Sequence, residues 1–131
     1  LGAHEEQPSR WYKQDGKWRF RKDGKDVTGW VFDKNVWYYL DPDGYMAANA
    51  WRKVNGWWYY LTGTGAMAAG WRKIGGFWYY LNPQSGKEPL GGMLTGLREI
   101  GGKKYLLNPV GAHGVPEGAL IVTDESGVVK V

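Results

Sequence analysis

Residues 51–61 read WRKVNGWWYYL, a stretch in which two Trp residues stand seven positions apart around an Asn-Gly dipeptide. Asn-Gly tolerates positive φ at both central positions of a type I′ turn. A two-residue turn at 55–56 pairs residue 54 with 57, 53 with 58, 52 with 59 and 51 with 60. Directly opposed residues share a face and faces alternate along a strand. The stretch therefore predicts a β-hairpin with Trp51, Trp58 and Tyr60 on one face and Val54, Trp57, Tyr59 and Leu61 on the other.

The pattern is repeated along most of the chain. The Trp pairs are Trp11 and Trp18, Trp30 and Trp37, Trp51 and Trp58, and Trp71 and Trp78. Tyr-Tyr-Leu follows the second Trp in three units, and Gly-x-Met follows in two of them, ending at Met46 and Met67. An isolated hairpin is marginal in water, whereas stacked copies bury a face against their neighbours. We therefore expect an all-β fold, a solenoid of about five to six β-hairpins.

Three segments are expected from this pattern. Residues 1–10 are polar and lack periodicity, which is typical of a linker or tail. Residues 11–117 carry the repeats, with units starting near 11, 30, 51, 71 and 97 and an insertion from Gln84 to Gly92. Residues 118–131 are rich in Val, Leu and Ile and are expected to form a terminal hairpin that caps the stack. Left uncovered, that hairpin would instead pair with its copy in a second chain and form a homodimer.

Composition excludes several classes of protein. The chain has 131 residues, with 21 Gly, 9 Trp and 9 Tyr, and no Cys, so disulfides and Cys-based metal sites are excluded. The net charge of +4 divides into +2, +2 and 0 over residues 1–29, 30–90 and 91–131, too diffuse a distribution for a nucleic-acid-binding stripe. No stretch of the sequence approaches the roughly 20 apolar residues of a membrane span, and none has the pattern of a signal peptide. We expect a mature form or an excised part of a longer protein.

The sequence does not predict an enzyme, a metal site or a cofactor. His4 lies in the polar tail and His113 in a Gly- and Pro-containing loop, so no second His accompanies either. The acidic residues, such as Asp33, Asp41 and Asp43, stand at predicted turns, where turn chemistry explains them. Any catalytic domain is expected before Leu1.

The Trp and Tyr face is better suited to binding. A quaternary ammonium has no N–H to donate, and it is attracted to the negative faces of aromatic rings, Trp above all. Sugar rings also stack on Trp and Tyr, and nearby polar residues could serve their hydroxyl groups. Those residues are Arg52, Lys53, Arg72, Lys73, Asp41 and Asn82. The residues alone leave three roles open: binding of choline or a phosphocholine polymer, binding of a glucan or another carbohydrate, and a structural or protein-partner role. For Tyr38, Tyr59 and Tyr79 on the opposite face, core packing is the preferred interpretation.

The repeat Gly-Trp-x6-Trp-Tyr-Tyr-Leu with a following Gly-x-Met resembles the choline-binding, or cell-wall-binding, repeat of Gram-positive surface proteins and phage lysins, over about residues 11–107. The resemblance implies a secreted or cell-surface module that binds choline, carried as phosphocholine on teichoic acid-type polymers. Related repeats in glucan-binding proteins and toxins keep the glucan alternative open.

The resemblance also implies where the ligand lies. Two Trp of one hairpin and the second Tyr of the next would form each aromatic box. The first would use Trp11, Trp18 and Tyr39, the second Trp30, Trp37 and Tyr60, and the third Trp51, Trp58 and Tyr80. Met46 and Met67 would line the outer pockets. A fourth box at Trp71 and Trp78 is expected to be lost or remodelled, because Leu107 stands at the Tyr position and the insertion precedes it. The first unit departs from the pattern, with Arg19-Phe20 after Trp18 and Asp26 at the Met position.

Overall fold

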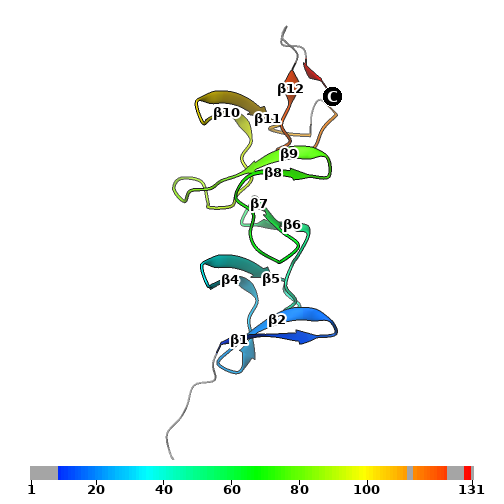
Figure 1. Ribbon diagram of the computed structural model, residues 1–131, viewed down its shortest axis with the longest axis vertical. Coiled ribbons are helices and arrows are strands. Elements are labelled where there is room, and N and C mark those ends of the chain that lie inside the picture. Colours follow the sequence, from blue (N-terminus) through cyan, green and yellow to red (C-terminus); the bar gives the residue numbers. More distant parts are fainter. Residues whose placement is uncertain (1–8, 112–113, 124–128, 131) are drawn as a thin grey trace, which may run out of the picture. The chain divides into compact units, whose positions relative to one another are not determined.

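The computed structural model describes residues 9–111, 114–123 and 129–130 (Figure 1). Every regular element in this part of the chain is a β-strand. Contacts between Cα atoms divide the chain into two units, Leu1–Arg52 with Tyr60–Met67, and Lys53–Tyr59 with Ala68–Val131. Each unit is described by itself. Most of the predicted tail at 1–10, including His4, and also His113 lie outside the described residues.

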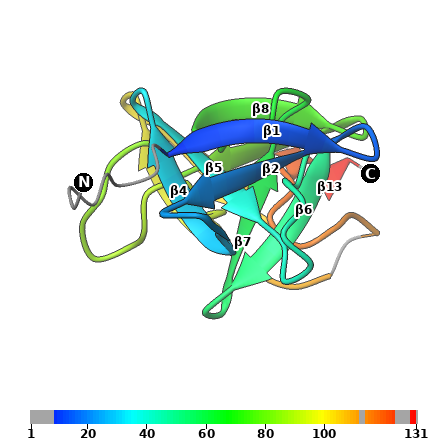
Figure 2. The ribbon, with the colours of Figure 1, turned by 90° about the horizontal axis from the view of Figure 1, so that it is seen from below.

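The first unit begins with a three-stranded sheet. β1 (Arg10–Gln14), β2 (Lys17–Lys22) and β3 (Lys25–Asp26) are paired in that order. β4 (Gly29–Asp33) and β5 (Val36–Leu40) form the next hairpin. β6 (Ala50–Val54) pairs with β7 (Trp57–Leu61), and the boundary between the two units falls within these two strands. Figure 2 shows β1 and β2 as neighbouring antiparallel strands. Hairpins therefore follow one another along the chain, as the repeat predicts.

The second unit continues the series with three two-stranded sheets. β8 (Gly70–Ile74) pairs with β9 (Phe77–Leu81), and β10 (Gly96–Ile100) pairs with β11 (Lys103–Leu107). β12 (Val122–Thr123) pairs with β13 (Val129–Lys130), so the backbone forms the closing hairpin. Residues 124–128, between the two strands, and Val131 lie outside the described residues.

The observed register matches the one predicted from the two-residue turns. Trp30 pairs with Tyr39, and Trp71 pairs with Tyr80. The turn residues have the left-handed backbone that type I′ turns need, with φ of 51° at Asn55 and 83° at Gly56. The alternation of faces derived from the sequence is therefore confirmed for these hairpins.

A recurring Leu forms the buried centre of each repeat. Leu40, Leu61, Leu81 and Leu107 have no exposed surface. Each forms a β-bridge with the residue that ends the following turn: Leu40 with Met46, Leu61 with Met67, Leu81 with Met93 and Leu107 with Leu120. Leu107 is thus the equivalent of the core Leu, and the residue aligned with the second Tyr is its neighbour Leu106.

The same hydrogen bond ties successive repeats together. The backbone N–H of Met46 donates to the carbonyl of Trp18 at 2.9 Å, that of Met93 to Trp58 at 2.8 Å, and that of Leu120 to Trp78 at 2.7 Å. These bonds fix the Met or Leu backbone beside the second Trp of the preceding hairpin. The sequence reading missed Met93, because the inserted loop hides its spacing from β9.

The first hairpin replaces this apolar bridge with ions. Arg21 pairs with Asp26 in the register, where later repeats pair Leu with Met. Asp26 accepts hydrogen bonds from Tyr12 and from Arg19, with Arg19 Nη2 at 2.9 Å. This face follows no earlier repeat in the described chain, so charged residues can occupy positions that are apolar elsewhere.

The long loops after β9 and β11 are held by the same pattern of hydrogen bonds from an Asn side chain. The side-chain amide of Asn82 donates to the carbonyls of Glu88 and Pro89 at 2.8 and 3.0 Å. Asn108, which has no exposed surface, donates in the same way to the carbonyls of Val115 and Pro116 at 2.9 and 3.3 Å. Each loop therefore folds around an Asn side chain, which is half-buried for Asn82 and fully buried for Asn108.

Candidate functional site

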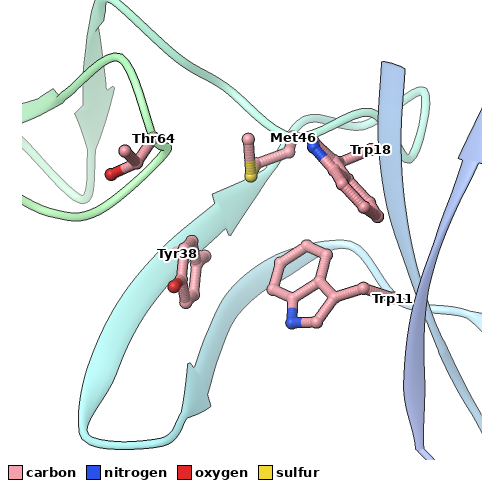
Figure 3. Close-up of a pocket in the computed structure, with 5 residues that line it drawn as sticks. All are labelled: Trp11, Trp18, Tyr38, Met46 and Thr64. Carbon is pink, nitrogen blue, oxygen red and sulfur yellow. The ribbon is translucent and has the colours of Figure 1, made fainter. Parts of the chain in front are cut away.

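A pocket in the first unit brings together residues of two hairpins (Figure 3). Its volume is about 270 Å³, and it is lined by Trp11 from β1, Trp18 from β2, Tyr38 from β5, and Met46 and Thr64 from the turns that follow β5 and β7. Trp18 keeps 40% of its surface exposed. The two Trp residues point from the same hairpin face because Trp11 and Trp18 are diagonal neighbours in the register. The result is a ring-walled cup open to solvent.

Trp11 is held in place from three sides. Its ring meets Tyr38 with centroids 4.8 Å apart at 68°, and Phe20 at 4.9 Å and 71°. Its indole Nε1–H donates to Asp33 Oδ2 at 3.0 Å. Edge-to-face contacts of this kind stabilise a fixed ring orientation. Trp11 is therefore a rigid wall, oriented by a carboxylate that the sequence had placed only in a turn.

Met46 reaches the pocket because Gly65 leaves room for it. A Cβ atom on Gly65 would overlap Met46 Sδ, and Gly65 has a φ of 88° that disfavours other residues. Met93 has the same relation to Gly118 in the second unit. The Gly of the Gly-x-Met motif thus has two roles: it adopts the positive φ of its own turn, and it leaves space for the Met side chain of the preceding repeat.

The structure corrects the prediction for the third wall of the first box. Tyr38 lines the pocket, whereas Tyr39 lies against Trp30 of its own hairpin with centroids 5.0 Å apart. Tyr60 and Tyr80 likewise contact Trp51 and Trp71 of their own hairpins, at 5.2 and 4.9 Å. The register is the reason: the second Tyr shares a face with its own Trp pair, so the first Tyr faces back toward the preceding repeat.

A second pocket lies in the second unit, at the position of the fourth box that was expected to be lost or remodelled. Its volume is about 330 Å³, and Trp71, Trp78, Tyr105 and Leu120 line it. Tyr105 meets Trp71 at 4.9 Å and 65°, closely matching the contact of Tyr38 with Trp11. Because Leu106 matches the second Tyr, Tyr105 matches the first. The remodelling is confined to Leu120, which stands where Met46 stands in the first pocket.

For the two middle Trp pairs, the contacts that follow join residues of the same unit. Trp30 and Trp37 stand at 88° to each other with centroids 6.3 Å apart, and Met67 N–H donates to the Trp37 carbonyl at 2.8 Å. Trp58 accepts the corresponding bond from Met93. The sequence equivalents of Tyr38 are Tyr59 and Tyr79. Both are buried, and burial raises the pKa of each phenol.

Positive charge is concentrated near the first pocket. Residues 10–26 hold seven Lys and Arg against three Asp, a net charge of +4 that equals the net charge of the whole chain. The division into long windows hid this, because Glu5 and Glu6 fall in the same window. Hydrogen bonds from Tyr12 and Arg19 lower the pKa of Asp26. Its carboxylate therefore stays ionised between Arg19 and Arg21.

The described part of the chain contains neither a candidate metal site nor a candidate membrane-spanning helix. No group of three or more His, Asp or Glu there is arranged to hold a metal ion. Nor does that part contain a helix with the length and apolar character of a membrane span.

Comparison with known proteins identifies the repeat. A choline-binding repeat model matches residues 48–88, and a putative cell wall binding repeat model matches residues 28–46. A search of curated protein sequences gave no match. The chain belongs to the choline-binding repeat family.

Solved structures of the family agree with the fold of this choline-binding repeat protein. Choline binding protein F of Streptococcus pneumoniae is 31% identical over 92% of this chain, with a TM-score of 0.71. CbpJ of the same organism is 31% identical over 95%, with a TM-score of 0.70. The pneumococcal cell wall endolysin from phage Cp-1, complexed with choline, is 25% identical over 99%, with a TM-score of 0.65. The present chain spans 44%, 46% and 40% of these proteins, respectively.

Proposed function

We propose that this chain is a non-catalytic cell-wall-binding module that holds the choline groups of a phosphocholine-bearing polymer of the teichoic acid type. The observation that carries the proposal is the pocket of Trp11, Trp18 and Tyr38 with Met46 beside it. The pocket of Trp71, Trp78 and Tyr105 repeats that arrangement in the second unit. The endolysin structure complexed with choline supports the same ligand.

The geometry suits a methylated cation for a physical reason. Three aromatic walls present π-faces to a group that cannot donate a hydrogen bond, and each cation–π contact contributes about 0.5–2 kcal/mol. A three-walled pocket would therefore bind free choline near the millimolar range, where 1 mM corresponds to about −4 kcal/mol. Such weak sites gain through effective concentration when several of them meet one polymer.

The proposal extends to the other Trp pairs and to the setting of the protein. Trp30 with Trp37 and Trp51 with Trp58 carry the same residue types as the Trp pairs of the two pockets. We infer a secreted or cell-surface location from the cell wall repeat. Pairing of the C-terminal hairpin with a second copy stays a prediction, which sedimentation at several protein concentrations tests.

Titration of the intrinsic Trp fluorescence tests the choline proposal. We expect a saturable change with choline chloride in the millimolar range and no such change with dextran. Trp18→Ala should remove the part of the fluorescence change that comes from choline binding in the first pocket. Leu97→Ala is the matched control, because Leu97 occupies a leading-Trp position, is 68% exposed and lines neither pocket. A response to dextran alone would favour a glucan-binding module instead.

A further inference from the structure

One position beside the second Trp changes character from repeat to repeat. The residue that pairs with the second Trp across the hairpin is Lys13 opposite Trp18, Phe32 opposite Trp37, and Lys73 opposite Trp78. Lys53 has its ammonium 5.7 Å from the centroid of the Trp58 ring. The Trp is constant, while its neighbour is a Lys in three hairpins and an aromatic ring, that of Phe32, in one. The position therefore changes the chemistry at the edge of each Trp pair without changing its walls.

Lys13 places a charge beside the first pocket. Its Nζ lies 5.0 Å from the centroid of the Trp18 ring, and Trp18 lines the pocket. Lys13 is exposed and shares a hairpin face with Trp11 and Trp18, one step closer to the turn than Trp11. Within the described ranges, Lys13 forms no ion pair. Its ammonium is therefore available to an anionic group on a ligand held by Trp18.

The neighbouring charges favour an anion at this edge. Arg19 and Arg21 are both paired with Asp26, and the carboxylate of Asp33 accepts the hydrogen bond of Trp11. The first sheet nevertheless keeps its net charge of +4. Such a surface opposes the approach of a simple cation and attracts a ligand that also carries negative charge. Phosphocholine is such a ligand, with a phosphate two carbon atoms from its trimethylammonium group.

We propose that Lys13 is a specificity residue that binds the phosphate of phosphocholine while the trimethylammonium group occupies the pocket of Trp11, Trp18 and Tyr38. This rests on the proposed function. The pair of Trp30 and Trp37 lacks the preference, because Phe32 stands at the same position, with its ring 4.9 Å from Trp37. The site at Trp18 thus prefers phosphocholine to choline, whereas the site at Trp37 binds the trimethylammonium group without regard to the phosphate.

The expected preference is modest because Lys13 is exposed. Exposed ion pairs contribute about 0.2–1 kcal/mol, which corresponds to a preference of at most about fivefold in affinity. The effect should weaken as salt is added, since the pair is screened over a Debye length of about 10 Å at 0.1 M ionic strength. A measurement at low ionic strength therefore gives the largest signal.

Indole N–H resonances separate the sites. The protein labelled with ¹⁵N is titrated with choline chloride and, separately, with phosphocholine, and the signals of Trp18 and Trp37 are assigned by single Trp→Phe variants. The measured quantity is the ratio of the two dissociation constants at each Trp. We expect about a twofold to fivefold preference for phosphocholine at Trp18 and a ratio near one at Trp37.

Four variants test the role of Lys13. Lys13→Met should abolish the preference at Trp18 and Lys13→Arg should retain it, while Phe32→Lys should create a preference at Trp37. Lys17→Met is the matched control: it removes the same charge from the same hairpin, but Lys17 lies over Tyr45 and pairs with Gln14 rather than with a Trp. Lys17→Met should leave most of the preference intact.

The outcomes separate this proposal from the one on which it rests. Equal ratios in wild type and Lys13→Met, or equal losses in Lys13→Met and Lys17→Met, would overturn the role of Lys13 while choline binding stands. Tighter binding of free choline by Lys13→Met, with no change in the ratio, would show instead that the lysine competes for the Trp18 ring. Absence of any indole shift with either ligand would contradict the proposed function itself.

Discussion

The ring of Tyr38 meets the indole of Trp11 with centroids 4.8 Å apart, although the two residues belong to different hairpins. Tyr39, the next residue in the chain, turns the other way and contacts Trp30 of its own hairpin. Because neighbouring residues of a strand point to opposite faces, the two Tyr residues contact the Trp residues of different hairpins. The pair Tyr38 and Tyr39 is therefore a built-in control for the first pocket.

Replacing Tyr38 should weaken choline binding at the first pocket, and replacing Tyr39 should not. Tyr38→Leu removes one aromatic wall, worth about 0.5–2 kcal/mol, which is about a twofold to thirtyfold loss of affinity. Tyr39→Leu makes the same chemical change one residue away and on the opposite face. The measurement is the dissociation constant for choline from the Trp18 indole resonance. Equal losses in the two variants would contradict the assignment of Tyr38 as the wall.

Asp33 should act on the same pocket through Trp11. Asp33→Ala removes the acceptor of the Trp11 Nε1–H, and the net value of such a bond is about 0.5–1.5 kcal/mol. We expect weaker choline binding at Trp18 and a shifted Trp11 indole resonance. Asp33→Asn retains an acceptor oxygen but not the charge, so it should preserve more of the Trp11 signal. Asp23→Asn, a charge loss in the turn between β2 and β3, controls for general electrostatics. A Trp11 indole resonance that does not change in Asp33→Ala would contradict the role of Asp33 in orienting Trp11.

Two glycines with similar backbone distinguish turn strain from pocket damage. Gly65 and Gly56 have φ of 88° and 83°, so Ala strains either turn, at about 1 kcal/mol or more. Only at Gly65 would the new Cβ overlap Met46 Sδ, whereas Gly56 has open space around it. Both variants should lower the free energy of unfolding, measured by urea titration, but Gly65→Ala should in addition weaken choline binding at Trp18. Similar choline affinities in the two folded variants would show that Met46 can move aside without cost.

Much of the fold could be predicted from the sequence because its signals are local. Asn55-Gly56 specifies a two-residue turn, the turn fixes the register, and the register fixes which side chains share a face. The repeat of Trp pairs then indicated hairpins in series, and the structure confirms the two-residue turns between β1 and β2, β4 and β5, β8 and β9, and β10 and β11. No long-range information was needed for these elements.

The errors arose where one hairpin meets the next. The box was assigned to the second Tyr from the family resemblance, although the register already placed Tyr39 on the same face as Trp30. The fourth site was expected to be lost or remodelled because Leu107 was matched to the Tyr position, whereas Leu107 is the core Leu of its hairpin and Tyr105 lines the pocket. Asn108 and Asn82 carry the signal that was missed: each precedes a Pro and each folds a loop that returns to the core Leu.

The last prediction concerns the loop after β9 and its dependence on pH. Glu88 accepts hydrogen bonds from both terminal nitrogens of Arg98, at 2.7 and 2.6 Å. The guanidinium holds the pKa of Glu88 below its ordinary value. A carboxyl group whose pKa is lowered on folding stabilises the folded state above its unfolded pKa of about 4.3, and this contribution is lost as pH falls through the folded pKa. The pair should therefore contribute at neutral pH and not in acid.

The comparison of wild type with Glu88→Gln measures this contribution. Because the side chains of Arg98 and Glu88 are 29% and 33% exposed, we expect the wild type to be more stable by no more than about 1 kcal/mol at pH 7. The difference should shrink toward zero as pH falls from about 5 to about 2, when Glu88 is protonated in both states. Urea unfolding at a series of pH values gives both curves, and Glu99→Gln on β10 controls for loss of a carboxylate from the same region. A difference that stays constant down to pH 2 would mean that the Gln variant disturbs the loop itself and that the ion pair contributes little.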